Sequence, residues 1–124
     1  CGLKGCNETF ISGTGLSLDY AATTGQSANA ADIVARSEAG DAPAAASLAS
    51  YIDRLARATA TVINLIDPHV IVLGGGLSNI QSLYRDLPPL VEHYSFSAET
   101  PTRIVQNRHG DSSGVRGAAW LAPK

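Results

Sequence analysis

The chain has 124 residues, of which 44% are hydrophobic and 16% charged, and its formal net charge is −2. This length suits one domain with a hydrophobic core and is too short for two. The small negative charge gives no electrostatic basis for binding nucleic acid or an anionic membrane. No apolar run approaches the roughly 20 residues that a membrane-spanning helix requires. With only two cysteines, close together, a disulfide framework is not indicated, and we expect a cytoplasmic protein.

The first third of the sequence predicts three short helices. Gly13 and Gly15 interrupt the segment from about residue 8 to 22, so we expect a short helix, a turn and a second helix there. A third helix should begin at Asp32 and end near Gly40.

A long helix is predicted from Pro43 to Ile66. Proline suits the first turn of a helix, and the helix should stop at Asp67, because a residue before proline is disfavoured in the α region. We expect Leu55 and Val62 to lie against the strand that follows. Apolar spacing of three and four predicts one buried face, made of Leu48, Tyr51, Ile52, Leu55, Thr59, Val62, Ile63 and Ile66.

The second half of the chain predicts the strands. His69 to Leu73 is apolar on both faces, as in the middle of a covered parallel sheet. The triplet Gly74, Gly75 and Gly76 ends this strand. Ser78 should cap the next helix, which we expect Pro88 and Pro89 to break.

A second strand is expected at residues 102–106, and a last helix at residues 115–121, anchored by Trp120. The order of elements is α/β. Two strands make a poor sheet, so we expect residues 1–124 to be a single incomplete domain of a longer protein that supplies further strands.

Cys1 and Cys6 form a candidate half of a metal site. Gly2 and Gly5 allow the short loop to bring both sulfurs to one point. A structural zinc needs about four ligands, so the others would lie upstream. Two small buried residues or a local disulfide are the alternatives.

Three further segments have both a functional and a structural interpretation. Glu8 is either a ligand-binding carboxylate or a first-turn residue that complements the helix dipole. The glycine triplet either admits a ligand at the carboxyl end of the sheet or is a tight turn. His109 near Asp111 suggests acid/base chemistry, but a solvated loop is favoured because no nucleophile accompanies the pair.

These segments together resemble the C-terminal part of the ROK family, whose zinc motif is Cys-x-Cys-Gly-x-x-Gly-Cys-x-Glu. Residues 1–8 match everything after its first Cys-x. Residues 70–76 look like the adenosine-side glycine motif of that family, and residues 114–119 look like its closing helix. Within the family, the stretches 8–15, 64–79 and 109–121 resemble fructokinases of the manno(fructo)kinase type.

The resemblance implies the C-terminal portion of an actin-like, hexokinase-type ATPase fold (ribonuclease H-like), rich in helices and with two strands here. It implies an ATP-dependent kinase that converts fructose to fructose 6-phosphate, with Mg²⁺ and a structural zinc, as a homodimer. Glu8 would contact the sugar, Gly74 to Gly76 the adenosine, and Cys1 and Cys6 the zinc. The family's general-base aspartate lies upstream, so the chain alone should be inactive.

Two other functions share these features. A ROK transcriptional repressor keeps the zinc loop and sugar pocket, and would carry a helix-turn-helix upstream. An independent metal-binding module is disfavoured, because half of the expected ligands are absent. The intact Gly74–Gly76 triplet favours the kinase.

Overall fold

The structure, a computed structural model, describes residue 2 and residues 5–96, 102–110 and 113–121. Its first two helices are α1 (Glu8–Ile11) and α2 (Gly13–Thr24), which confirms the predicted division. Only Ser12 separates them. Its hydroxyl accepts a hydrogen bond from the N–H of Gly15 at 3.0 Å and so caps α2. Glycine at position 25 ends α2 in the left-handed conformation, with φ of 71°.

Two side-chain caps start the next helices. The Asn29 side chain accepts from the N–H of Asp32 at the start of α3 (Ala30–Glu38), and the Asp41 side chain accepts from the N–H of Ala44 in α4 (Ala42–Ile66). The long helix ends at Asp67, as predicted, in a left-handed conformation with φ of 49°.

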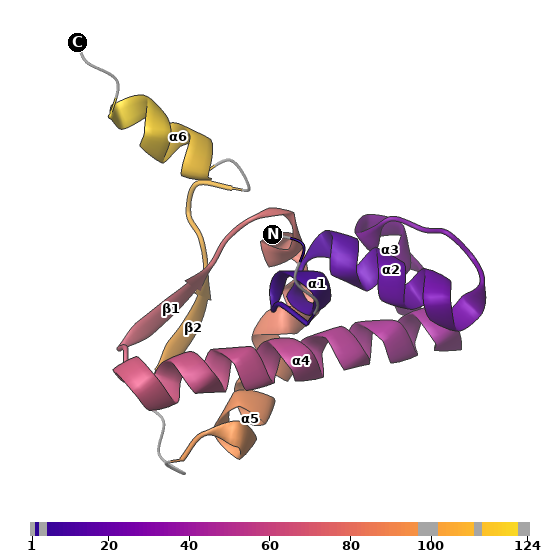
Figure 1. The fold of residues 1–124 in the computed structure, drawn as a ribbon, viewed down its shortest axis with the longest axis horizontal. Coiled ribbons are helices and arrows are strands. Elements are labelled where there is room, and N and C mark those ends of the chain that lie inside the picture. Colours follow the sequence, from indigo (N-terminus) through magenta and orange to yellow (C-terminus); the bar gives the residue numbers. More distant parts are fainter. Residues whose placement is uncertain (1, 3–4, 97–101, 111–112, 122–124) are drawn as a thin grey trace.

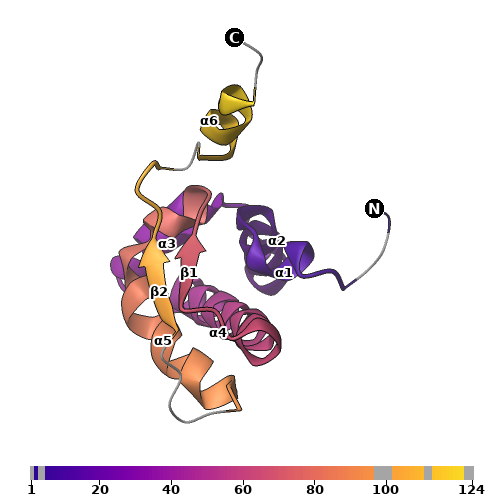
Figure 2. The ribbon, with the colours of Figure 1, turned by 90° about the vertical axis from the view of Figure 1, so that its left-hand side faces the viewer.

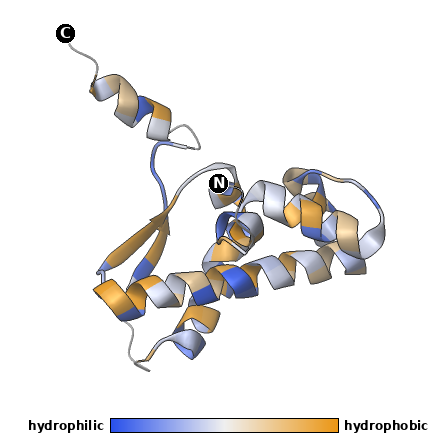
Figure 3. Cartoon of the chain, viewed as in Figure 1, coloured by the Kyte–Doolittle hydropathy of each residue, from blue (hydrophilic) through white to orange (hydrophobic). Residues whose placement is uncertain are grey.

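The helix α4 lies between α5 and the helices α1 and α2 (Figure 1), and it contributes six of the thirteen residues of the buried core cluster, more than any other element. Of the eight residues predicted to form the buried face of this helix, five are buried and Leu55 is half-buried. The predictions for Val62 and Ile66 are wrong, because these side chains are 43% and 70% exposed. The ribbon at this end of α4 has the colour of hydrophobic residues (Figure 3), and Val62, Leu65 and Ile66 are exposed there. The buried face consists of Ala44, Ser47, Leu48, Tyr51, Ile52, Ala56, Thr59, Ala60 and Ile63.

The helix α5 (Gln81–Tyr94) continues through Pro88 and Pro89, so the predicted break is wrong. Proline removes a helical hydrogen bond and costs about 3 kcal/mol. Here the residues before and after the prolines remain on one buried face, formed by Leu83, Leu87 and Val91. Packing of that face holds the helix together across the two prolines.

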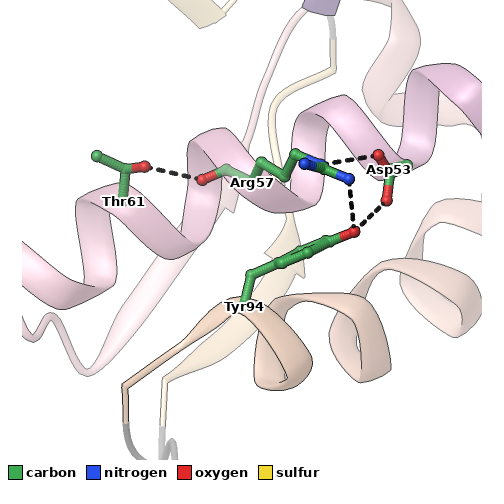
Figure 4. A network of polar contacts seen from close by, with 4 residues as sticks. All are labelled: Asp53, Arg57, Thr61 and Tyr94. Carbon is green, nitrogen blue, oxygen red and sulfur yellow. Dashed lines mark hydrogen bonds and ion pairs between the residues drawn. The ribbon is translucent and has the colours of Figure 1, made fainter.

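A polar network joins α4 to the end of α5 (Figure 4). The Tyr94 hydroxyl donates to Asp53 at 2.6 Å, and the Arg57 guanidinium donates to both Asp53 and Tyr94, at 2.9 and 3.0 Å. Thr61 donates to the carbonyl of Arg57 at 2.9 Å. The hydrogen bond from Tyr94, together with Arg57, lowers the pKa of the Asp53 carboxyl below its ordinary value.

The two strands, β1 (Val70–Leu73) and β2 (Arg103–Gln106), pair in parallel with Val70 opposite Arg103. They lie beside α4 and α5 (Figure 2). One face of the sheet, including Ile71, packs on the core, whereas Val70 and Val72 are 44% and 55% exposed. The sequence predicted that both faces of the sheet would be covered. Among the described residues, only one face is covered.

The remaining elements are a 3-10 turn, η1 (Gly76–Asn79), and the final helix α6 (Ser113–Trp120). Ser78 lies inside η1 and does not cap α5, because α5 begins after Ile80 with no side-chain cap. The predicted anchoring by Trp120 is also wrong: its side chain is 90% exposed, and α6 extends away from the other elements (Figure 1). None of the helices in the described ranges has the length and apolarity needed to cross a membrane.

Candidate functional site

Two cavities adjoin each other where the chain leaves the carboxyl end of β1. They share Gly13, Gly76 and Leu77 in their linings and have volumes of about 340 and 580 Å³. Ligands of α/β proteins bind at the carboxyl ends of parallel strands. The position of both cavities therefore fits a ligand-binding site.

The smaller cavity brings together two predicted sites that lie far apart in the sequence. Glu8 lines it from the first position of α1, and Gly74, Gly75 and Gly76 line it from the turn after β1. The carboxylate of Glu8 is exposed, so its oxygens are available to hydroxyl donors. In such a cavity the carboxylate can bind a polyhydroxylated ligand. The glycine turn can admit a second ligand close to its backbone.

Tyr51, on α4, forms another part of the smaller cavity. Its side chain is 3% exposed, and its hydroxyl donates to the carbonyl of Ile11 at 3.3 Å, which joins α4 to the end of α1. Burial raises the pKa of Tyr51 to about 12. The neutral phenol is therefore the form that the fold accommodates.

The raised pKa of Tyr51 predicts a loss of stability at alkaline pH. Between pH 10 and about 12 the unfolded chain loses the phenolic proton, whereas the folded chain keeps it. The free energy of unfolding should therefore be unaffected by this group below pH 10 and fall above it, by about 1.4 kcal/mol per pH unit. In urea titrations across this range, Tyr51→Phe should have the shallower pH dependence. Equal slopes for both proteins would contradict the burial of this hydroxyl.

The larger cavity lies between α3 and the start of α5. Its α3 wall is apolar, with Ala30, Ala31, Val34 and Ala35, and Glu38 stands at the end of this wall. Such a lining suits an apolar group that carries a few polar atoms.

The described residues do not by themselves form a metal centre. Cys1 lies outside them, and the part of the chain that the structure describes holds no group of three or more metal-ligating side chains. Cys6 is half-buried, and its carbonyl accepts from the N–H and the hydroxyl of Thr9. A closed tetrahedral zinc site needs four ligands, so this chain offers at most half of one through Cys1 and Cys6.

The suggested pair His109 and Asp111 has no described geometry, because Asp111 lies outside the described residues. His109 is exposed and lines neither of the two cavities; it lies beside Arg116, Gly117 and Trp120.

Sequence reasoning missed several residues around the cavities. Its spacing predicts only a core position for Tyr51, and the small apolar residues of α3 carry no sequence signal of a binding site. Asn107 lines neither cavity and has no sequence motif, but it directly follows β2 at the carboxyl end of the sheet, a position that indicates a site residue when the side chain is polar.

The profile of the ROK family matches residues 1–124. The chain is 44% identical, over 121 residues, to an N-acetyl-D-glucosamine kinase of Aliivibrio salmonicida, and the match covers 98% of this chain and 40% of that protein. The chain therefore spans about two-fifths of the length of this curated relative.

Two solved structures share the fold. A ROK family glucokinase from Streptomyces griseus, in complex with glucose and AMPPNP, superposes with a TM-score of 0.83 at 24% identity, over 98% of this chain and 46% of that one. A ROK family transcriptional regulator, homologous to the E. coli MLC protein, gives 0.70 at 25% identity, over 86% and 30%. The predicted fold, the C-terminal portion of an actin-like ATPase with two parallel strands here, is confirmed.

Proposed function

The chain belongs to the ROK family, and from this premise we propose that it is the C-terminal part of an ATP-dependent hexose kinase. The observation that carries the proposal is the joint lining of one cavity by Glu8 and by Gly74 to Gly76. The kinase relative that matches 98% of the chain supports the same activity.

In this proposal the two cavities hold the two substrates. Glu8 accepts hydrogen bonds from sugar hydroxyls in the smaller cavity, and the glycine turn lets adenosine approach its backbone. The adenine ring suits the apolar α3 wall of the larger cavity. Mg²⁺ would accompany the ATP phosphates and neutralise charge on them. No residue of this chain is proposed as the general base, which the family resemblance places upstream.

Two hexoses are candidate substrates. N-acetyl-D-glucosamine is supported by the name of the relative at 44% identity, and fructose by the resemblance of residues 8–15 and 109–121 to fructokinases. The first is the better supported of the two, and fructose stays a prediction.

The test is phosphorylation by a full-length protein that contains this chain. ADP release is measured with Mg-ATP and N-acetyl-D-glucosamine, fructose or glucose in turn. Turnover with a hexose supports the kinase, and the ratio of kcat/KM values identifies the sugar. Absence of turnover with every hexose, together with sugar-dependent DNA binding, would instead identify a transcriptional regulator, the second candidate because a regulator shares this fold.

We also propose that Cys1 and Cys6 supply two of four ligands to a structural zinc, with the other two from a segment that precedes them in the full-length protein. Metal analysis of the wild type and of a Cys6→Ala variant tests this proposal. The expected homodimer stays a prediction, which the mass of the full-length protein in solution checks.

Gly75→Val in the full-length protein should raise the KM for ATP by roughly 10-fold or more, with the KM for the hexose nearly unchanged. Gly75 has φ of 80° and ψ of 177°, a conformation that is essentially restricted to glycine. A side chain here would both distort the turn and extend into the space next to it, since no atom lies within 4 Å of an added Cβ.

Gly40→Val is the matched control for this substitution. Gly40 also has a positive φ, of 90°, but it lies between α3 and α4 and lines neither cavity. The control should therefore lower stability without changing the KM for ATP. Unchanged ATP kinetics in Gly75→Val would reduce the triplet to a structural turn.

A further inference from the structure

The side chain of Asn107 joins the two ends of the glycine turn. It directly follows β2, and its amide donates to the carbonyl oxygen of Leu73 at 3.1 Å and to the hydroxyl of Ser78 at 2.9 Å. Leu73 is the last residue of β1, and Ser78 lies in η1. The amide oxygen accepts from the N–H of His109 at 3.1 Å, which orients the donor side toward the turn.

Ser78 connects Asn107 to the glycine turn, because it is hydrogen-bonded to both. Its hydroxyl donates to the carbonyl oxygen of Gly75 at 2.6 Å, and its own carbonyl accepts from the Tyr84 hydroxyl at 2.6 Å. Ser78 is only 2% exposed, so these hydrogen bonds are shielded from water. A continuous chain of hydrogen bonds therefore runs from Asn107 to Gly75.

The turn depends on such external contacts for its conformation. Three successive glycines have little backbone preference of their own, and Gly75 adopts its conformation with φ of 80°. A Cβ added at Gly74, Gly75 or Gly76 would meet no atom within 4 Å, so no neighbouring group presses on the turn from those directions. The turn is held by the hydrogen bonds from Asn107 to Leu73 and Ser78 and from Ser78 to Gly75.

We propose that Asn107 is a positioning residue that preorganises the glycine turn for the nucleotide. Asn107 lines neither cavity, so it acts through Ser78 and Gly75 rather than by touching a substrate. A turn already held in its binding conformation loses less conformational entropy when the ligand binds. The inference rests on the proposed kinase function, in which this turn receives adenosine.

The experiment compares Asn107→Ala with Thr102→Val in the full-length protein. The Thr102 hydroxyl donates to the carbonyl of Pro68 at 2.6 Å, at the opposite end of the same strand pair. Each variant loses side-chain hydrogen bonds between a residue next to β2 and the segment that contains β1. Only Asn107→Ala loses a contact to the glycine turn. Steady-state kinetics and equilibrium binding of ATP are measured for both, together with thermal stability.

Asn107→Ala should raise the KM and the dissociation constant for ATP by roughly 10-fold, while the KM for the hexose changes by less than about twofold. Thr102→Val should lower the melting temperature and leave both constants for ATP unchanged. Ser78→Ala should weaken ATP binding as Asn107→Ala does, and the double variant should be little worse than either, because both changes interrupt one chain of bonds.

An Asn107→Ala protein that binds ATP as tightly as the wild type would overturn the inference while leaving the kinase standing. An equal loss of ATP affinity in Thr102→Val would also overturn it, since the effect would then be general weakening of the sheet. If Asn107→Ala does not fold, Ser78→Ala tests the next bond in the chain; because Ser78 also lines the smaller cavity, the inference then requires that the KM for the hexose stays unchanged. A wild-type protein that turns over its hexose shows that the proposed function itself holds.

Discussion

Glu8→Ala in the full-length protein is expected to lower kcat/KM for the preferred hexose by roughly 10- to 1000-fold, or about 1.4–4 kcal/mol, while ATP binding stays nearly unchanged. Glu8 lines the smaller cavity from the first turn of α1. Hydrogen bonds between a carboxylate and sugar hydroxyls are charge-assisted, so their loss costs more than that of a neutral pair. The measurement is the steady-state rate at varied hexose and at varied ATP.

Asp32→Ala is the control that distinguishes a sugar-binding role of Glu8 from a role in complementing the helix dipole. Asp32 is also an exposed carboxylate in the first turn of a helix, α3, where it complements the helix dipole. It lines neither cavity, so its loss should change kcat/KM by less than about twofold. If both replacements had the same small effect, Glu8 would be no more than a helix-end residue.

Local signals predicted the ends of the long helix α4 well, because helix ends depend on a few neighbouring atoms: Pro43 lies in its first turn and Asp67 ends it. Ser12, Asn29 and Asp41 each cap a helix with a side-chain oxygen, although none of these caps was predicted from the sequence, and the predicted cap at Ser78 is wrong. Asp67 and Gly25 end helices in the left-handed conformation. Each of these interactions lies within about one turn of the residue that makes it, so the sequence alone is sufficient to indicate it.

The failed predictions concern interactions with distant parts of the chain. Pro88 and Pro89 do not break α5, because Leu83 and Val91 are buried together across them. Val62 has the correct helical spacing, but its side chain stays 43% exposed among the described residues. Spacing shows which residues share a face of a helix, and only the tertiary structure shows how far along the helix that face is covered.

The candidate site was predicted in pieces and assembled by the fold. Motifs indicated Glu8 and Gly75 separately, but 66 residues of chain, three of the helices and β1 lie between them. Their shared cavity follows from the packing of α1 and α4 beside the carboxyl end of β1. Asn107 has no sequence motif, since its role depends on where β2 ends relative to the glycine turn.

Gly15→Ala should destabilise the protein by about 1–3 kcal/mol, although alanine is the better helix former. In a helix interior the exchange of glycine for alanine stabilises by about 1 kcal/mol. At position 15, however, an ideal Cβ would stand 2.6 Å from the carbonyl oxygen of Thr9 and 2.9 Å from its carbonyl carbon. Both are backbone atoms of α1, so α1 must shift, and overpacking outweighs the gain in helix propensity.

The shift of α1 should also reach the sugar site, because Glu8 precedes Thr9 directly on this one-turn helix. We therefore expect the KM for the hexose to rise by roughly 10-fold in Gly15→Ala, with a smaller change for ATP. Gly13→Ala is the control for stability: it lies in the same helix, and its Cβ would meet only Ala30 and Leu77 at 3.7 and 3.8 Å, which are ordinary contacts. Its unfolding midpoint should equal or exceed that of the wild type. If Gly15→Ala is as stable as Gly13→Ala, then α1 does not pack against α2 as closely as the structure has it. If its hexose kinetics are also unchanged, the position of Glu8 does not depend on that contact.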